Sequence, residues 1–424
     1  MPTRSAADLA RLNVRRWHAR CPGAVEEEAM THALATQADA RALQVAGAEG
    51  AYVTDTDGKR YLDLAMGWCV GNLGWKHPAI EAAMQAFDGP TYVHPAHHHR
   101  PAQRLAERLV SVAPGNLRKV FRATGGTEAV ELALQAAMLA TRRHGVLCLE
   151  GAYHGNSIAT LSIGSSELRE RAQAGLPRCH RISPPFDARA AERAEVLLKK
   201  REIAAFVMEP IICNLGGVVP DATFVSTMRE LCRRYGTLFV ADEVASGFGR
   251  SGRMFACEHF NLEPDLLCVG KAITAGHAPM GATLMTARVG KTMEDKGEFW
   301  STYGWHPRSV CAAEATLDVF EKRGEELFAS ATTLGAHARE RLSFMPFASK
   351  AKVNGIGFII GVELESKREA KRVRDKCREG GVLLASAGDE TIELFPPLTI
   401  DARALDDGLD VIESCVGARR VKAA

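Results

Sequence analysis

The chain has 424 residues, of which 46% are hydrophobic and 25% charged, as in an ordinary globular protein of two or three domains. Its 53 basic and 51 acidic side chains nearly cancel, which argues against nucleic acid or an anionic membrane as a partner. No run approaches the roughly 18 apolar residues of a membrane-spanning helix. Residues 1–23 lack the apolar core of a signal peptide, so we expect a cytoplasmic protein.

The cysteines support the same compartment. There are 11 of them, an odd number, and none forms a C-x-x-C pair. Cys148 and Cys268 lie inside apolar runs that read as strands. This usage predicts reduced, packed thiols rather than a disulfide framework.

The first 75 residues read as a separate N-terminal segment. Residues 1–50 are polar with a helical pattern, and residues 51–67 (AYVTDTDGKRYLDLAMG) predict two strands around the turn Asp57-Gly58. We expect this segment, residues 1–75, to pack with a smaller domain at the other end of the chain.

Residues 76–310 alternate helical stretches with short apolar runs, which predicts an α/β domain with a mostly parallel sheet covered on both faces. A strong helix is predicted over residues 128–143, ending near Gly145. From residue 311 to 424 the pattern changes to a long helix followed by shorter elements, which we interpret as a smaller α/β domain. The strands predicted in the large domain lie at residues 119–122, 146–150, 204–210, 237–243, 265–271 and 282–286.

Polar groups follow five of these strands. In open α/β sheets, ligands bind beyond the carboxyl ends of the strands, so these groups should meet at one rim. The groups are residues 124–127 (TGGT), residues 153–155 (YHG), Glu209, residues 242–243 (DE) and Lys271.

Lys271 and Asp242 each end a buried strand, where a charge must be paired or used. A partly desolvated lysine amine can act as a nucleophile and form a Schiff base, although a lone lysine is commonly a salt-bridge partner. A strand-end aspartate can serve as counter-ion to a protonated ring nitrogen, or it can belong to a structural ion pair. Each residue alone leaves both interpretations open.

The stretch around Gly125, Gly126 and Thr127 lies between a strand and a strong helix. Bare glycine amides at a helix N-terminus favour an anion such as phosphate, although a tight turn capped by Thr127 would have the same sequence. No Gly-Lys-Thr/Ser follows, which excludes a Walker loop. Together, a phosphate cradle, an aromatic residue, an aspartate and a lysine are the parts of a pyridoxal phosphate site.

At this point the residues match a known family. The chain resembles the class III (ω-amino acid type) aminotransferases of pyridoxal phosphate fold type I, over about residues 50 to 400. The resemblance implies a large domain with a mostly parallel, seven-stranded type of sheet and a smaller C-terminal domain. The strings that carry it occur in the family's order and read DTDGKRYLDLAMG, LGWKHP, GGTEAVE, YHG, MEP, DEVASGFGRSG, PDLLCVGKAITAGHAPMGA, STYGWHP and FPPLTI.

The resemblance implies pyridoxal 5'-phosphate as cofactor and a role for each matching residue. Lys271 would form the Schiff base and Asp242 would pair with the pyridine nitrogen, while Val244 and Tyr153 would hold the two faces of the ring. The cofactor-binding set would also include Gly125, Gly126, Thr127, His154 and Glu209. Thr302 would reach the phosphate of a neighbouring subunit, which implies a homodimer with shared sites, with a tetramer as the alternative.

Departures from the family pattern concern the phosphate and the substrate. Gly125 stands where a serine is usual, and Ala245 stands where a glutamine is usual. Glu393 and Asn214 replace the arginine that grips the substrate carboxylate and its glutamate partner. We therefore expect a primary amine or ω-amine donor, a keto acid acceptor and a donor site near Glu393. Trp68 is either an aromatic residue against the substrate or a core tryptophan.

Three other interpretations compete. Residues 247–252 fit the G-x-G-x-x-G pattern of a dinucleotide-binding dehydrogenase, but they neither follow a strand directly nor open a clear helix. The histidines at positions 94, 97, 98 and 99 could suggest a metal, yet no acidic or cysteine ligand lies at a fixed spacing, so we expect no metal. Aminomutases and racemases share the fold and the cofactor residues, and amino transfer is favoured because the motif set is that of amine and ω-amino acid transaminases.

Overall fold

The computed structural model describes residues 42–165, 169–170, 175 and 178–416. The chain divides into two compact units, Met1–Gln44 and Val45–Ala424, and the second unit carries all the sheets. The helical pattern predicted for residues 1–41 lies outside the described residues. Residues 45–49 were wrongly assigned to that helical stretch, because they form strand β1 (Val45–Glu49) instead.

The largest sheet has seven strands and is mostly parallel, as expected. Only β10 runs antiparallel to its two neighbours within this sheet, and the other neighbours pair in parallel. All six predicted strands are confirmed, and β6 was missed because His180 and Arg181 interrupt its apolar pattern at the edge of the sheet. The spatial order is β4 (Leu117–Ala123), β10 (Gly281–Thr286), β9 (Leu266–Val269), β8 (Leu238–Asp242), β7 (Ile203–Met208), β5 (Gly145–Leu149) and β6 (Cys179–Ile182).

The central strands are apolar throughout because each one faces two cores. In β5, Val146 and Cys148 belong to one apolar cluster, whereas Leu147 and Leu149 belong to another. Strands β8 and β9 alternate in the same way. Since successive side chains of a strand point to opposite faces, both faces of the sheet must be covered by helices.

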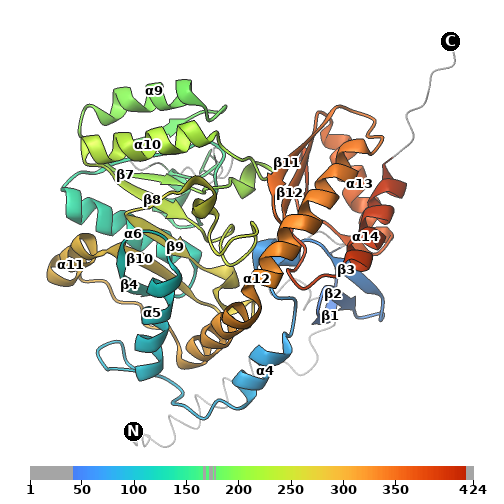
Figure 1. The fold of residues 1–424 in the computed structure, drawn as a ribbon, viewed down its shortest axis with the longest axis horizontal. Coiled ribbons are helices and arrows are strands. Elements are labelled where there is room, and N and C mark those ends of the chain that lie inside the picture. The colour runs from blue at the N-terminus through green and yellow to red at the C-terminus, as the bar shows by residue number, and fades with distance from the viewer. Residues whose placement is uncertain (1–41, 166–168, 171–174, 176–177, 417–424) are drawn as a thin grey trace, which may run out of the picture. The chain divides into compact units, whose positions relative to one another are not determined.

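Helices cover both faces, as Figure 1 shows. Helices α6 (Gly126–Thr141) and α11 (Ala287–Lys296) pack into one cluster. Helices α5 (Arg100–Val112), α9 (Ala188–Leu198) and α10 (Ala222–Tyr235) pack into the other. The predicted helix over residues 128–143 is α6, which is apolar nearly all round because it packs against several strands at once.

The C-terminal third forms the smaller α/β region. Strands β11 (Ala351–Ile356), β12 (Ile359–Leu364) and β14 (Thr391–Leu394) make an antiparallel sheet of three strands. The long helix α12 (Pro307–Phe344) packs on β11 and also contacts α4 (Pro78–Gln85) and α5, so it connects this region to the large sheet (Figure 1). The remaining elements here are α13 (Lys367–Glu379), β13 (Val382–Leu383) and α14 (Ala402–Cys415).

The predicted hairpin around Asp57-Gly58 is confirmed. Strands β2 (Tyr52–Asp55) and β3 (Arg60–Asp63) pair antiparallel, and the Asp55 carboxylate accepts hydrogen bonds from the amides of Asp57 and Lys59 within the turn. Strand β3 also pairs in parallel with β13, so the hairpin shares a four-stranded sheet with the C-terminal region. The three predicted domain boundaries remain a prediction.

Short helices complete the fold close to the ends of the large sheet. They are α3 (Met66–Cys69), α7 (Ile158–Ser162), and the 3-10 helices η1 (Cys213–Leu215), η2 (Ala256–Phe260) and η3 (Lys271–Thr274). No helix in the described part of the chain combines the length and the apolar character needed to cross a membrane.

Candidate active site

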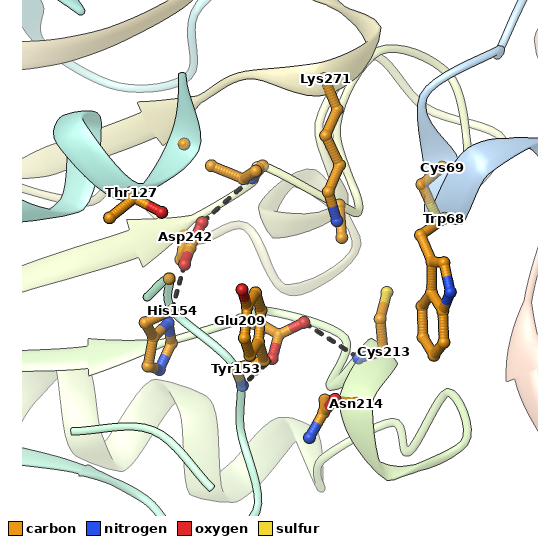
Figure 2. Close-up of a pocket in the computed structure, with 14 residues that line it drawn as sticks. Trp68, Cys69, Thr127, Tyr153, His154, Glu209, Cys213, Asn214, Asp242 and Lys271 are labelled. Carbon is orange, nitrogen blue, oxygen red and sulfur yellow. Dashed lines mark hydrogen bonds and ion pairs between the residues drawn. The ribbon is translucent and has the colours of Figure 1, made fainter. Parts of the chain in front are cut away.

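A cavity of about 740 Å³, including its open mouth, lies at the carboxyl ends of the parallel strands (Figure 2). All predicted site residues line it except Gly125, Thr302 and Glu393. The lining residues are Trp68, Cys69, Gly126, Thr127, Tyr153, His154, Gly155, Glu209, Cys213, Asn214, Asp242, Val244, Ala245 and Lys271.

Asp242 is the last residue of β8 and is buried. One carboxylate oxygen lies 2.7 Å from Nδ1 of His154, and the other accepts a hydrogen bond from the amide of Val244 at 3.1 Å. Burial lowers the pKa of His154, but the hydrogen bond and the charge of Asp242 outweigh this effect and raise the pKa above its usual range. A protonated His154 would therefore form an ion pair with Asp242.

Glu209 follows β7 and holds two segments of the cavity together. Its carboxylate accepts one hydrogen bond from the amide of Tyr153 and another from the amide of Cys213, each at 3.1 Å (Figure 2). Burial raises the pKa of Glu209 to about 7, with His154 opposing the rise and Asp242 adding to it.

Lys271 lies directly after β9 and Gly270, at the start of η3. No residue in the described ranges forms an ion pair or hydrogen bond with its Nζ, so the alternative of a salt-bridge partner lacks support in the structure. Its φ is 43°, a left-handed value that is strained for a residue with a side chain. Such strain is commonly found at functional sites, where the surrounding structure holds it in place.

The N-terminus of α6 forms a narrow cradle of backbone. A Cβ added at Gly126 would lie 2.6 Å from a methyl carbon of Val244, and one added at Gly155 would lie 2.7 Å from the Thr127 hydroxyl. Thr127 also accepts a hydrogen bond from the amide of Asn156 at 3.3 Å. Close backbone approach next to a helix N-terminus fits an anion such as phosphate.

Another part of the cavity comes from segments far apart in the sequence. We name Trp68, Cys69, Cys213 and Asn214 the thiol wall; the first two belong to α3 and the last two to η1. The Trp68 ring lies 6.0 Å from that of Phe395, and Asn214 donates a hydrogen bond to the carbonyl of Gly151 at 2.8 Å. Trp68 is 38% exposed and faces the cavity, so it is not a core tryptophan.

Cys69 and Cys213 were not predicted as site residues, because the cysteines were interpreted together as packed thiols. All ten cysteines within the described ranges are free, as expected for reduced thiols. The only available signal was position, since Cys69 follows Trp68 directly and Cys213 comes four residues after Glu209.

Three of the predicted site residues do not line the cavity. Gly125 is the residue before α6, and the carbonyl of Thr302 accepts a hydrogen bond from the Tyr92 hydroxyl at 3.1 Å. Glu393 is buried on β14, and neither of its carboxylate oxygens has a hydrogen-bond partner among the described residues. Burial raises the pKa of Glu393 well above its usual range, with the charges of Cys69 and Glu209 adding to the rise and the charge of Arg374 opposing it. Its role in substrate binding remains a prediction.

Neither the glycine-rich stretch nor the histidine cluster forms a binding site among the described residues. Residues 247–252 form turns after β8, and the next helix is the short η2. The rings of His94 and His97 lie 5.5 Å apart, and within the described residues no three histidine, cysteine or acidic side chains gather as a metal site would require.

Comparison with known proteins gives relatives along nearly the whole chain. The family model described as Aminotransferase class-III matches residues 33–416. An acetylornithine aminotransferase of Methanosarcina mazei is 34% identical over 373 residues, which are 88% of this chain and 91% of the relative. An adenosylmethionine-8-amino-7-oxononanoate aminotransferase of Aquifex aeolicus is 32% identical over 411 residues, covering 86% of this chain and 89% of that relative.

Solved structures agree with these relatives. The structure of an amine transaminase from an uncultivated Pseudomonas species, with pyridoxal phosphate bound, has a TM-score of 0.83 at 30% identity and covers 91% of this chain and 97% of that chain. A transaminase from the marine bacterium Virgibacillus shares the fold with a TM-score of 0.86 at 24% identity, covering 92% and 97%.

Proposed function

The chain belongs to the class-III aminotransferase family, and we propose that it moves the amino group of a primary amine or ω-amine donor to a keto acid. Its cofactor is pyridoxal phosphate. When bound, this group supplies an aldehyde for the amine and a ring that accepts the electrons of the broken C–H bond. The relatives described above are all aminotransferases, and none favours the aminomutase or racemase alternative.

The observation that carries the proposal is the amine of Lys271, which has no partner among the described residues, in one cavity with the buried carboxylate of Asp242. Lys271 Nζ would hold the aldehyde carbon and, once released by the donor, would carry a proton between the two carbons bonded to the transferred nitrogen. Asp242, which contacts His154, would hold the ring-nitrogen proton in place. Lys271 would therefore transfer protons, and Asp242 would stabilise charge.

The other residues would bind and orient. Gly125, Gly126 and Thr127 at the N-terminus of α6 would hold the phosphate, where backbone amides and the helix dipole favour an anion. Val244 and Tyr153 would contact the two faces of the ring, and Glu209 fixes the amide of Tyr153. The Gly126 contact with Val244 leaves no room for a side chain there, which fits a planar group held close to the backbone.

The choice of donor rests on what the cavity lacks. Its charged lining residues are Glu209, Asp242 and Lys271, with His154 as a further titratable group, and no arginine is present among the described lining residues. A substrate carboxylate would therefore lose its hydration without gaining a guanidinium partner. Donors whose reacting carbon carries no carboxylate should be preferred, with Trp68 contacting the donor side chain.

Nitrogen transfer tests the proposal directly. Purified enzyme with its cofactor would be given ¹⁵N-labelled primary amines, ω-amino acids or α-amino acids together with an unlabelled keto acid. Label in the amino acid formed from the keto acid, fastest with donors that lack an α-carboxylate, is the expected result. Rearrangement or loss of stereochemistry in a single substrate, without label transfer, would instead identify an aminomutase or a racemase.

We also propose a cytoplasmic homodimer, in which Thr302 of each subunit reaches the phosphate site of the other. The resemblance at Thr302 supports this assembly, and the free cysteines support a reducing compartment. Sedimentation at decreasing concentration, with activity measured in parallel, tests it. Fully active monomers would contradict shared sites, and a stable larger species would favour a tetramer.

A further inference from the structure

Residues Met66–Cys69, which form α3, are a strained left-handed turn. Their φ angles are 43°, 57°, 60° and 66° in chain order. Three of the four residues carry side chains, for which the left-handed region costs free energy. Such a conformation persists only where the surroundings impose it, and it is commonly found at functional sites.

The turn brings one large side chain to the cavity. Met66 is fully buried and Cys69 is only 1% exposed, although Cys69 also lines the cavity. Trp68 is 38% exposed and lines the cavity with its ring 6.0 Å from that of Phe395 (Figure 2). A strained turn that buries its other side chains and leaves an indole facing a cavity fits a contact surface for an apolar ligand group.

The Asp63 carboxylate holds the start of this turn. One of its oxygens accepts hydrogen bonds from the amides of Ala65 at 3.0 Å and Met66 at 2.8 Å. The other oxygen accepts a hydrogen bond from Nε1 of Trp75 at 3.0 Å. Because Asp63 is buried, these bonds replace the water that its carboxylate has lost. Asp63 therefore fixes the turn at Met66, and Trp75 fixes Asp63.

Trp75 also contacts the turn directly. A Cβ added at Gly67 would lie 3.2 Å from Cη2 of the Trp75 ring. The same ring reaches Gly276, five positions after Lys271, where an added Cβ would lie 3.0 Å from Cζ3. Trp75 therefore packs between the turn and the segment that follows Lys271, which fixes the position of Trp68 relative to that segment.

We propose that Asp63 and Trp75 are positioning residues for the amine donor, because together they hold the left-handed turn so that the Trp68 ring forms one wall of the donor site. Neither residue is among those that line the cavity, so each acts through Trp68. Donors with an aromatic group gain most from this wall, since an indole supplies contact area rather than charge. The donor role rests on the proposed function, whereas the hold on the turn does not.

The neighbouring hairpin contains the same arrangement away from the cavity. One oxygen of the Asp55 carboxylate accepts two amides of the turn between β2 and β3, and the other accepts the Tyr61 hydroxyl at 2.9 Å. None of these residues is among those that line the cavity. Asp55→Asn and Tyr61→Phe are therefore matched controls for Asp63→Asn and Trp75→Phe.

The experiment measures kcat and KM of the holoenzyme for benzylamine and propylamine in the donor half-reaction, followed by the absorbance of the bound cofactor. Asp63→Asn leaves one acceptor oxygen for two amides and the indole N–H, so at least one bond is lost. We expect KM for benzylamine to rise roughly three- to tenfold, the fold-change that corresponds to one hydrogen bond, with a smaller rise for propylamine and kcat nearly unchanged.

Trp75→Phe keeps Asp63 and its bonds to the two amides, so it provides the same test if Asp63→Asn does not fold. It should raise KM for benzylamine at least as much, because it removes ring contacts as well as the hydrogen bond. The two hairpin controls should keep the KM of wild type. In a Trp68→Ala background, Asp63→Asn should cause no further rise in KM, because its effect passes through Trp68.

These outcomes separate positioning from general stability. A lower kcat with unchanged KM, or an equal rise of KM in the hairpin controls, would mean that Asp63 only stabilises the fold and would overturn the proposal. A further rise of KM in the Trp68→Ala background would also overturn it.

Hydrogen exchange of the peptide that carries residues 63–70 keeps this test separate from the test of amino transfer. We expect the amides of Ala65 and Met66 to exchange faster in Asp63→Asn and Trp75→Phe than in wild type and the hairpin controls. Unchanged exchange would overturn the hold on the turn. Faster exchange in an enzyme that reacts with neither amine would retain the hold and overturn the donor role.

Discussion

Two regions of the cavity differ in how the fold positions them. The strand-end rim, formed by Thr127, Glu209, Asp242 and Lys271, lies where strands of the seven-stranded sheet end. The thiol wall lies on two short helices, α3 and η1, that belong to no sheet. At the rim, the order of the strands in the sheet determines where a residue lies. In the thiol wall, the position of a residue depends on short turns whose contacts come from segments distant in the sequence.

This difference separates cofactor chemistry from substrate choice. The rim retains nearly every residue type that a pyridoxal phosphate site requires, and its geometry is fixed by the hydrogen-bonded ladder of the sheet. The departures at Asn214 and Glu393, which are expected to face the substrate, fall on η1 and on the small three-stranded sheet, outside the rim. Variation at these two positions can therefore change the substrate without disturbing the strands that position the cofactor.

Breaking the rim should have the largest effect. Lys271→Ala should lose covalent attachment of the cofactor and lower kcat/KM by roughly a thousandfold or more, because both the aldehyde-binding amine and the proton carrier are removed. Borohydride reduction followed by peptide mapping measures the attachment. Lys271→Arg is the matched control, since it keeps a cation but cannot form the bond and should be equally inactive. Cofactor found on another lysine would show that the assignment is wrong.

The rim could be predicted from the sequence because its signals are local. Each polar residue follows an apolar run of strand length, and parallel strands bring such residues to one edge. Trp68 was predicted beside the substrate, but Cys69 and Cys213 of the thiol wall were not predicted, because left-handed φ angles such as those at Trp68 and Cys69 have no sequence signature when the residues carry side chains. Strand β6 was hidden by His180 and Arg181, and strand β1 by its polar setting, since edge positions do not require apolar residues.

Changing Glu393 beside the wall should have an intermediate effect. The sequence predicts a donor site near Glu393, and burial raises the pKa of this carboxyl well above its usual range, which favours its protonated form. Glu393→Gln should therefore leave the ratio of kcat/KM for a diamine and an α-amino acid of similar length nearly unchanged. Glu393→Arg should shift that ratio toward the amino acid by roughly 1 to 3 kcal/mol, the scale for pairing a buried polar group.

The two variants at Glu393 separate charge from size. A strong shift in the Gln variant would mean that wild-type Glu393 acts as an anion. An unchanged ratio in a folded Arg variant would place position 393 outside the reach of the substrate.

Glu209 links the two regions, because it accepts hydrogen bonds from the amide of Tyr153 next to the rim and from the amide of Cys213 in the wall. Burial raises its pKa in the folded protein from 4.5 to about 7. Between these values the folded state holds a proton that the unfolded state has released, so stability falls as pH rises through this window and is level above it. For a change from 4.5 to about 7 the loss in unfolding free energy is about 3 kcal/mol.

Glu209→Gln cannot ionise, and its one mismatched hydrogen bond should lower stability equally at every pH. The difference in unfolding free energy between wild type and Glu209→Gln, measured by denaturant titration from pH 4.5 to 8, should therefore move in favour of the Gln variant as pH rises. A difference that does not change with pH would show that Glu209 titrates at its ordinary value and joins the rim to the wall only as an ionised acceptor.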